Sequence, residues 1–237
     1  MREAGRIVAL TLAALRAAVR PGVSTAELDA LAEEMAHKHG AIPSFKGYRG
    51  YPASLCASIN EEVVHGIPSP RRVLREGDII SLDFGAVYEG LQGDAAITVP
   101  VGRVSETARR LLSVTEQALA VGVAQTRANN RLSDIGHAIQ TYVEGHGFSV
   151  VRQYVGHGIG RAMHEEPNVP NFGPPGRGPL LKPGMVLALE PMVNVGTYNT
   201  VVLDDNWTVV TEDGSLSAHF EHTVAVTPNG PAVLTLP

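Results

Sequence analysis

Four acidic residues stand in apolar stretches of this sequence, where a solvated charge is not expected. Asp83 follows the run IISL, and Asp94 comes eleven residues later in GDAA. Glu190 lies in MVLALEPMV and Glu221 in AHFEHTV, which are runs typical of buried strands. Burying a carboxylate is costly unless a partner or a cation compensates it, and two carboxylates together repel each other. Asp83 and Asp94 alone could be solvated turn residues, but the set of four predicts a site for divalent metal.

Three histidines have surroundings that favour a role in chemistry. His157 stands between glycines in GHGIG, where backbone and ligands can approach closely. His164 follows seven residues later, and His65 lies in VVHGIP. The sequence places four further histidines on helices or at helix ends, and we interpret these as ordinary structural residues: His37, His39, His137 and His146.

One imidazole with four carboxylates forms an oxygen-rich ligand set. Such a set suits two neighbouring divalent ions, with Mn, Fe(II) or Co more natural than Mg alone. Two such ions lower the pKa of a water between them and polarise a carbonyl group, which is the chemistry of hydrolysis. Other mechanisms lack their motifs, because the chain has no G-x-S-x-G elbow, no phosphate loop and no strand followed by G-x-G-x-x-G. Cys56 has no evident catalytic histidine.

The elements that must position these residues come in blocks of helices and strands. Apolar periodicity and breakers predict helices over residues 2–20, from Ser24-Thr25 to Gly40, over 111–124 and over 132–144. Strands are predicted over residues 54–59, 78–88, 93–101, 150–153, 185–195, 207–211 and 219–226. Blocks rather than strict alternation favour an α+β fold with antiparallel sheet. A glycine-rich turn between Asp83 and Asp94 predicts a hairpin that brings the two carboxylates together.

The two helix pairs have a similar layout, 107 residues apart, as judged from Gly40 and Gly147. At this offset Leu12 matches Leu119 and Leu28 matches Ile135. The pattern predicts one domain over residues 1–237, built from related halves of roughly 1–103 and 104–237, with a site between them. Coincidence between two amphipathic helix pairs is the alternative.

Composition narrows the class of protein. The formal charge is −5 in 237 residues, which argues against a protein held mainly to nucleic-acid phosphates or to an anionic membrane. No segment has the ~18 apolar residues that a membrane span needs. The single cysteine excludes an intrachain disulfide, and no export signal is evident, so we expect a cytoplasmic location.

The ordered motifs resemble those of the type I methionine aminopeptidases in their short bacterial form. The resemblance extends from residue 4 to about residue 226, and the agreeing stretches are GYRGYP (47–52), SINE (58–61), HGIP (65–68), GHGIG (156–160), HEEP (164–167), LKPGM (181–185), EPM (190–192) and FEHT (220–223). It implies the pita-bread fold, in which two pseudo-symmetric halves with antiparallel sheet and flanking helices surround a dinuclear metal site. It also implies removal of the initiator methionine from new polypeptides, with a preference for a small second residue.

The resemblance further implies a role for each site residue. Asp83 would chelate one metal ion and His157 the other, while Asp94 and Glu221 would bridge both. Glu190 would bind the ion on the His157 side and take part in proton transfer. His65 would hydrogen-bond the substrate, and His164 would stabilise the substrate carbonyl oxygen as it becomes negative. Such a site accepts Co, Mn, Fe(II), Zn or Ni.

The family's methionine pocket maps onto residues that suit a long, polarizable thioether. The implied substrate-binding residues are Phe45, Tyr48, Tyr51, Cys56, His65, Met163, His164 and Trp207. Phe45 stands where a cysteine is frequent, and Met163 where an aromatic residue is common. These two departures bear on the depth of the pocket. Without the resemblance, Trp207 would be interpreted as core and Cys56 as a small buried hydrophobe.

Partners and rival functions follow from the same resemblance. The expected partners are nascent polypeptide N-termini, with a transient ribosome contact, a monomeric chain, no nucleic-acid substrate and no membrane. One rival is an X-Pro aminopeptidase or prolidase, which shares the fold and the five ligands, although only 82 residues precede Asp83 here. The other rival is a binding protein that has lost catalysis, against which the complete ligand set counts.

Overall fold

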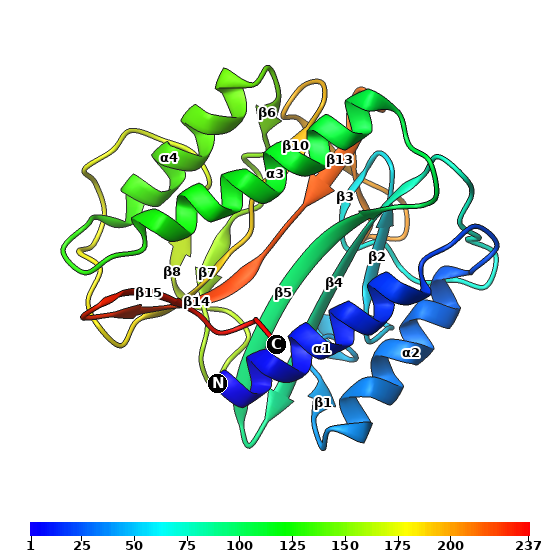
Figure 1. Ribbon diagram of the computed structural model, residues 1–237, viewed down its shortest axis with the longest axis horizontal. Coiled ribbons are helices and arrows are strands. Elements are labelled where there is room, and N and C mark those ends of the chain that lie inside the picture. Colours follow the sequence, from blue (N-terminus) through cyan, green and yellow to red (C-terminus); the bar gives the residue numbers. More distant parts are fainter.

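Four helices form two pairs, and strands follow each pair along the chain (Figure 1). The computed structural model describes residues 1–237. Its helices are α1 (Arg2–Ala18), α2 (Thr25–Lys38), α3 (Glu106–Gln125) and α4 (Leu132–Gly145). The strands before α3 are β1 (Ile42–Pro43), β2 (Cys56–Ile59), β3 (Glu62–Val64), β4 (Ile79–Tyr88) and β5 (Leu91–Pro100). The later strands are β6 (Ser149–Val150), β7 (Gly156–Gly158), β8 (Glu165–Val169), β9 (Val186–Leu189), β10 (Met192–Asn194), β11 (Thr200–Val202), β12 (Val209–Thr211), β13 (Ser217–His219), β14 (His222–Thr227) and β15 (Gly230–Val233).

The predicted helices are present, and their capping residues determine where they begin. Ser24 and Glu27 form a capping box at α2, in which each side chain accepts from the other residue's backbone N–H. Helix α3 starts at Glu106, five residues before the predicted start at residue 111. The reason is Ser105, whose hydroxyl accepts a hydrogen bond from the Ala108 N–H at 3.1 Å and caps the helix there.

Strands β4 and β5 form the predicted hairpin, joined by the two-residue turn Glu89-Gly90. Both turn residues have positive φ, 49° and 75°, as a type I′ turn requires. In the antiparallel register Asp83 faces Ala96 and Gly85 faces Asp94. The two aspartates therefore point to the same side of the sheet, because alternate residues of a strand share a face. Asp83 lies in the middle of β4, which continues to Tyr88.

Two strands predicted as continuous are each broken at an acidic residue. The strand predicted over 185–195 divides into β9 and β10 at Glu190-Pro191, and the one over 219–226 divides into β13 and β14 at Phe220-Glu221. On one side of the break β14 joins the five-stranded sheet β15-β14-β9-β7-β8. On the other side β10 and β13 belong to the three-stranded sheet β13-β10-β6. The acids thus lie where a strand pair passes from one sheet to another.

Each helix pair packs on the strands of its own half, and Figure 1 shows α1 and α3 crossing in front of the sheets. One apolar cluster joins α1 and α2 to β4 and β5, and a larger one joins α3 and α4 to the strands of the second half. Ile97 on β5 packs against both clusters. No helix combines the length and the apolar character needed to cross a bilayer.

Hydrogen bonds between β5 and the β13–β14 segment hold the two halves together. The N–H of Glu221 donates to the Ala96 carbonyl at 2.9 Å. The Thr223 hydroxyl donates to the Asp94 carbonyl at 2.7 Å and accepts from the Asp94 N–H at 3.0 Å. This seam fixes two acidic residues from different halves in one place, and it is entirely buried at Thr223.

We expect Thr223→Val to lower the free energy of unfolding by about 2 kcal/mol, because it leaves the buried Asp94 N–H and carbonyl without partners. Urea unfolding of the chelated protein would measure this loss apart from any metal binding. Thr107→Val, on the exposed face of α3, is the matched control and should change stability by less than about 0.5 kcal/mol. Equal effects of the two substitutions would contradict the importance of the seam.

Candidate metal centre and active site

The break between β9–β14 and β10–β13 brings Glu190 and Glu221 face to face. Leu189 pairs with His222 on one side, and Met192 pairs with His219 on the other. The same antiparallel register places Glu190 directly opposite Glu221. Like charges at facing positions destabilise a strand pair, so this arrangement needs a compensating cation.

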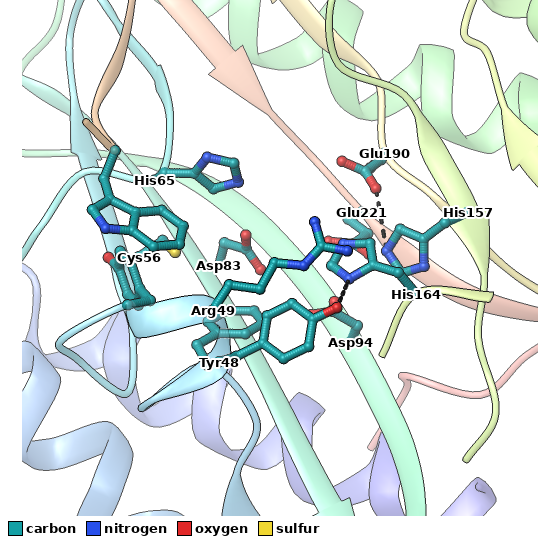
Figure 2. Close-up of a pocket in the computed structure, with 13 residues that line it drawn as sticks. Tyr48, Arg49, Cys56, His65, Asp83, Asp94, His157, His164, Glu190 and Glu221 are labelled. Carbon is teal, nitrogen blue, oxygen red and sulfur yellow. Dashed lines mark hydrogen bonds and ion pairs between the residues drawn. The ribbon is translucent and has the colours of Figure 1, made fainter. Parts of the chain in front are cut away.

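Asp83 and Asp94 complete the cluster from the β4–β5 hairpin (Figure 2). Asp94 and Glu221 are 4% and 2% exposed, whereas Asp83 and Glu190 are partly open to a cavity. One carboxylate oxygen each of Asp83, Asp94 and Glu221 is buried without a hydrogen-bond partner. Buried carboxylate oxygens without a donor fit a site for a cation, because buried polar atoms otherwise have a hydrogen-bond partner.

His157 enters the cluster from β7, the strand between β9 and β8. Its flanking glycines are required by packing, because a Cβ on Gly156 would lie 2.3 Å from the Ala188 carbonyl oxygen and one on Gly158 2.3 Å from that of Glu166. The backbone approach expected from the GHGIG motif is therefore confirmed. The Nδ1–H of His157 donates to the Gly158 carbonyl at 2.9 Å, which leaves the Nε2 lone pair free.

The free Nε2 faces the carboxylates. It lies 3.6 Å from Glu190 Oε1, and single ligand atoms of Asp94, His157 and Glu221 all lie within 4.8 Å of one another. Burial lowers the pKa of His157, so the imidazole is neutral and able to bind metal. The predicted ligands thus converge from three strands, β4, β5 and β7, and from two strand junctions, β9–β10 and β13–β14.

Burial is the main cause that raises the pKa of every acidic group in the cluster. It raises the pKa of Asp94 to about 7. The pKa values of Asp83, Glu190 and Glu221 are raised well above the ordinary range, first by burial and then by neighbouring carboxylates. Divalent cations would reverse these shifts and supply the missing positive charge. The donor set, four carboxylates and one neutral imidazole, fits divalent metal ions.

The cluster forms the floor of a cavity of ≈ 150 Å³. Every predicted site residue except Met163 lines it, and Arg49 lines it as well. Met163 is 2% exposed and lies behind the wall, where its Cε and the Phe45 ring both approach Gly85. A Cβ on Gly85 would lie 2.9 Å from each, so the glycine gives Met163 room and keeps it out of the cavity.

One wall of the cavity is aromatic and contains the only cysteine. The rings of Tyr51 and Trp207 meet edge to face at 5.1 Å, and His65 lies 6.1 Å from Trp207. The Tyr51 hydroxyl lies 3.1 Å from the Leu55 carbonyl oxygen and 3.0 Å from that of Gly66, so its proton is held by the backbone. Burial raises the pKa of the Cys56 thiol, which keeps this side chain an uncharged, soft neighbour for a ligand.

His164 and Tyr48 lie on the opposite side of the opening. The Tyr48 hydroxyl and His164 Nδ1 are 2.9 Å apart, and the His157 and His164 rings are 4.2 Å apart. Burial lowers the pKa of His164 to about 4, so the ring is neutral near pH 7. If the hydroxyl donates, Nδ1 is the acceptor and the single ring proton is on Nε2.

Sequence reasoning missed two residues that belong to this region. His219 is buried behind the acids, with Nε2 3.9 Å from Glu190 Oε2 and 4.0 Å from Glu221 Oε2. Neither of its ring nitrogens has a hydrogen-bond partner. Its position two residues before Glu221 was the available signal, because alternate strand residues share a face. Arg49 was missed because an arginine between glycines is typical of an exposed turn.

Comparison with known proteins places the chain in a class: it belongs to metallopeptidase family M24, whose sequence profile matches residues 1–228. The chain is 61% identical over 236 residues to the methionine aminopeptidase of Clostridium acetobutylicum, covering 100% of this chain and 94% of that protein. The present chain uses divalent metal ions, as members of this family do.

Solved structures confirm the pita-bread fold, and they resemble the chain to different extents in methionine aminopeptidases and in proline-specific enzymes. The methionine aminopeptidase of Thermotoga maritima superposes with a TM-score of 0.99 at 48% identity, covering 100% of this chain and 95% of that one. The Xaa-Pro dipeptidase of Bacillus anthracis gives a TM-score of 0.77 at 25% identity, and the match covers 59% of that chain. The chain therefore matches methionine aminopeptidases over nearly their whole length, and the proline-specific enzyme over little more than half.

We expect the melting temperature of the chelated protein to fall by about 3 °C or more between pH 7 and pH 8. The folded carboxyl groups have raised pKa values and retain protons that the unfolded chain releases, so stability decreases as pH rises. Histidines whose pKa is lowered, such as His65 to about 4, act below this window, and their effect there is small.

Thermal melts with and without added Mn²⁺ would test this expectation. Bound metal should abolish the decrease, because the ionised carboxylates are then paired. Glu221→Gln should flatten the slope in the chelated protein, since it removes one titrating group. A chelated protein whose melting temperature is constant or rises over this range would contradict the assignment of a repulsive acidic cluster.

Proposed function

We propose that this metallopeptidase removes the N-terminal methionine from polypeptides and prefers a small second residue. The observation that carries the proposal is one cavity with two parts: a carboxylate and imidazole cluster on its floor, and an aromatic and sulfur-containing wall beside it. The first is suited to metal-assisted hydrolysis and the second to a thioether side chain. The high identity to a methionine aminopeptidase supports the same conclusion.

The ligand roles form part of the proposal. Asp83 would hold one ion and His157 the other, Asp94 and Glu221 would contribute to both, and Glu190 would bind on the His157 side. The ions supply Lewis acidity and lower the pKa of the attacking water. The Glu190 carboxylate would accept a proton from that water and pass it on.

Two neutral imidazoles act on the substrate. The Tyr48 hydroxyl holds His164 in the tautomer with the proton on Nε2, so this nitrogen can donate to the substrate oxygen where negative charge develops. His65, whose pKa burial lowers to about 4, offers an uncharged hydrogen-bonding group beside Trp207. Neither group adds a positive charge that would repel the substrate amine.

The enclosed shape explains action at the chain end. The methionine side chain of the substrate packs against the wall formed by Phe45, Tyr51, Cys56 and Trp207. The N-terminal amine of the substrate then lies near the acidic floor. An internal residue has no amine to place there, so the site works as an exopeptidase. We further propose one catalytic domain over residues 1–237, with related halves of roughly 1–103 and 104–237. A monomeric cytoplasmic enzyme that acts on nascent chains, in transient contact with the ribosome, is the setting we expect.

The test is hydrolysis of Met-Ala-Ser by chelated protein, with Co²⁺, Mn²⁺ or Fe²⁺ added back anaerobically. We expect metal-dependent release of free methionine from this peptide and no release of alanine from Ala-Pro peptides. Cleavage only before proline would assign the chain to the proline-specific enzymes. Stoichiometric metal binding without turnover of either peptide would indicate a binding protein.

We expect His164→Ala to lower kcat about 100-fold with a smaller change in KM, because a donor to the developing oxyanion is worth this much in comparable sites. Tyr48→Phe should lower kcat less, since the His164 imidazole is retained and only the hydrogen bond that fixes its tautomer is lost. Steady-state kinetics on Met-Ala-Ser would measure both, with the exposed His37→Ala as control. A loss confined to KM would contradict the oxyanion role.

A further inference from the structure

Arg49 is the only lysine or arginine that lines the cavity, and it has no ion-pair partner there. Figure 2 shows its side chain beside the Tyr48 ring, reaching over the cavity toward His164. The guanidinium carbon lies 5.4 Å from the centre of the Tyr48 ring. No carboxylate lies within 4.0 Å of the guanidinium nitrogens, although four carboxylates line the same cavity.

The loop that carries Arg49 is well defined by backbone hydrogen bonds. The Gly47 N–H donates to the Tyr51 carbonyl at 2.8 Å, and the Tyr51 N–H donates to the Tyr48 carbonyl at 3.0 Å. Within this turn Arg49 has a φ of 51°, a left-handed conformation that non-glycine residues rarely adopt. The turn holds the backbone of Arg49 at the rim of the cavity.

Charge balance gives this arginine its importance. The four carboxylates carry four negative charges, which two divalent cations neutralise. No other lysine or arginine lines the cavity. The guanidinium is therefore the one permanently positive side chain of the cavity wall, and no carboxylate of the chain pairs with it.

We propose that Arg49 recognises the third residue of the substrate and selects for Asp or Glu there. This inference rests on the proposed function, which places the first side chain in the aromatic pocket and the scissile bond at the acidic floor. The second side chain is small, so the third is the first one free to be long as the chain leaves past the rim. A guanidinium binds a carboxylate through two parallel hydrogen bonds, which favours Arg49 for this task.

The test compares peptides that differ only at the third position: Met-Ala-Asp-Ser, Met-Ala-Asn-Ser and Met-Ala-Lys-Ser. Asp and Asn have nearly the same shape, so the ratio of their kcat/KM values isolates the charge. We expect the wild type to prefer Asp over Asn by about fivefold at low salt, the range for an exposed charge pair, and to lose this preference at high salt.

Two substitutions make the result specific to this residue. Arg49→Gln should bring the Asp-to-Asn ratio to about one, and Arg49→Glu should reverse the preference in favour of the Lys peptide. Arg71→Gln removes the same charge from an exposed position outside the cavity and should leave the wild-type ratio unchanged.

The outcomes separate this proposal from the one on which it rests. Release of methionine from the Asn peptide by the wild type and by Arg71→Gln keeps the aminopeptidase assignment. An Asp-to-Asn ratio that is unchanged in Arg49→Gln would overturn the role of Arg49 alone. Failure of the wild type to release methionine from any of the peptides would overturn the proposed function itself.

Discussion

Electrostatic repulsion among four carboxylates is the constraint on which the other parts of the structure depend. Asp83 and Asp94 share one face of a hairpin, and Glu190 and Glu221 face each other across a strand pair. Both arrangements bring like charges together where little water reaches them, which a fold tolerates only with a cation or with protons. The hydrogen bonds between β5 and the β13–β14 segment therefore stabilise the site against the repulsion between these carboxylates.

The charge of the polar side chains changes with their distance from this negative floor. The imidazoles of His65, His157 and His164 are neutral because burial lowers their pKa values, so they can bind or donate without adding to the field. The backbone fixes the His157 proton, and the Tyr48 hydroxyl can fix that of His164. Positive charge lies only at the rim, on Arg49. The cavity thus changes from acidic, through neutral, to basic between its floor and its opening.

The sequence predicts the helices and the β4–β5 hairpin well because their signals are local. Caps, breakers and a two-residue turn are all contained in a few neighbouring positions. The broken strands were predicted as continuous, since an apolar run around Glu190 or Glu221 has the same pattern whether its strand stays in one sheet or passes to another. Pro191 was the local hint, because proline interrupts a ladder of hydrogen bonds.

The site residues divide in the same way. Acids in apolar runs stand out in any sequence, and the four acidic ligands that we propose were selected on that ground, whereas His157 was selected for its flanking glycines. His219 did not stand out, because a histidine in a strand is ordinary until the fold places it behind two carboxylates. Met163 shows the converse, since a motif located it near the pocket but only packing against Phe45 and Gly85 decides that it lies behind the wall.

The position of Glu190 and Glu221 at a sheet junction would make a bound metal ion part of the fold. The acids occupy the positions where a strand pair leaves one sheet for another, and the junction has one long backbone hydrogen bond, from the Phe220 N–H to the Pro191 carbonyl at 3.4 Å. A cation held by the Glu190 and Glu221 carboxylates would link the two strands at this junction through their side chains. Its binding free energy would add to that of folding. Loss of the ion would loosen the connection between the sheets as well as stop the chemistry. The availability of metal in the cell would then influence the lifetime of the protein as well as its activity.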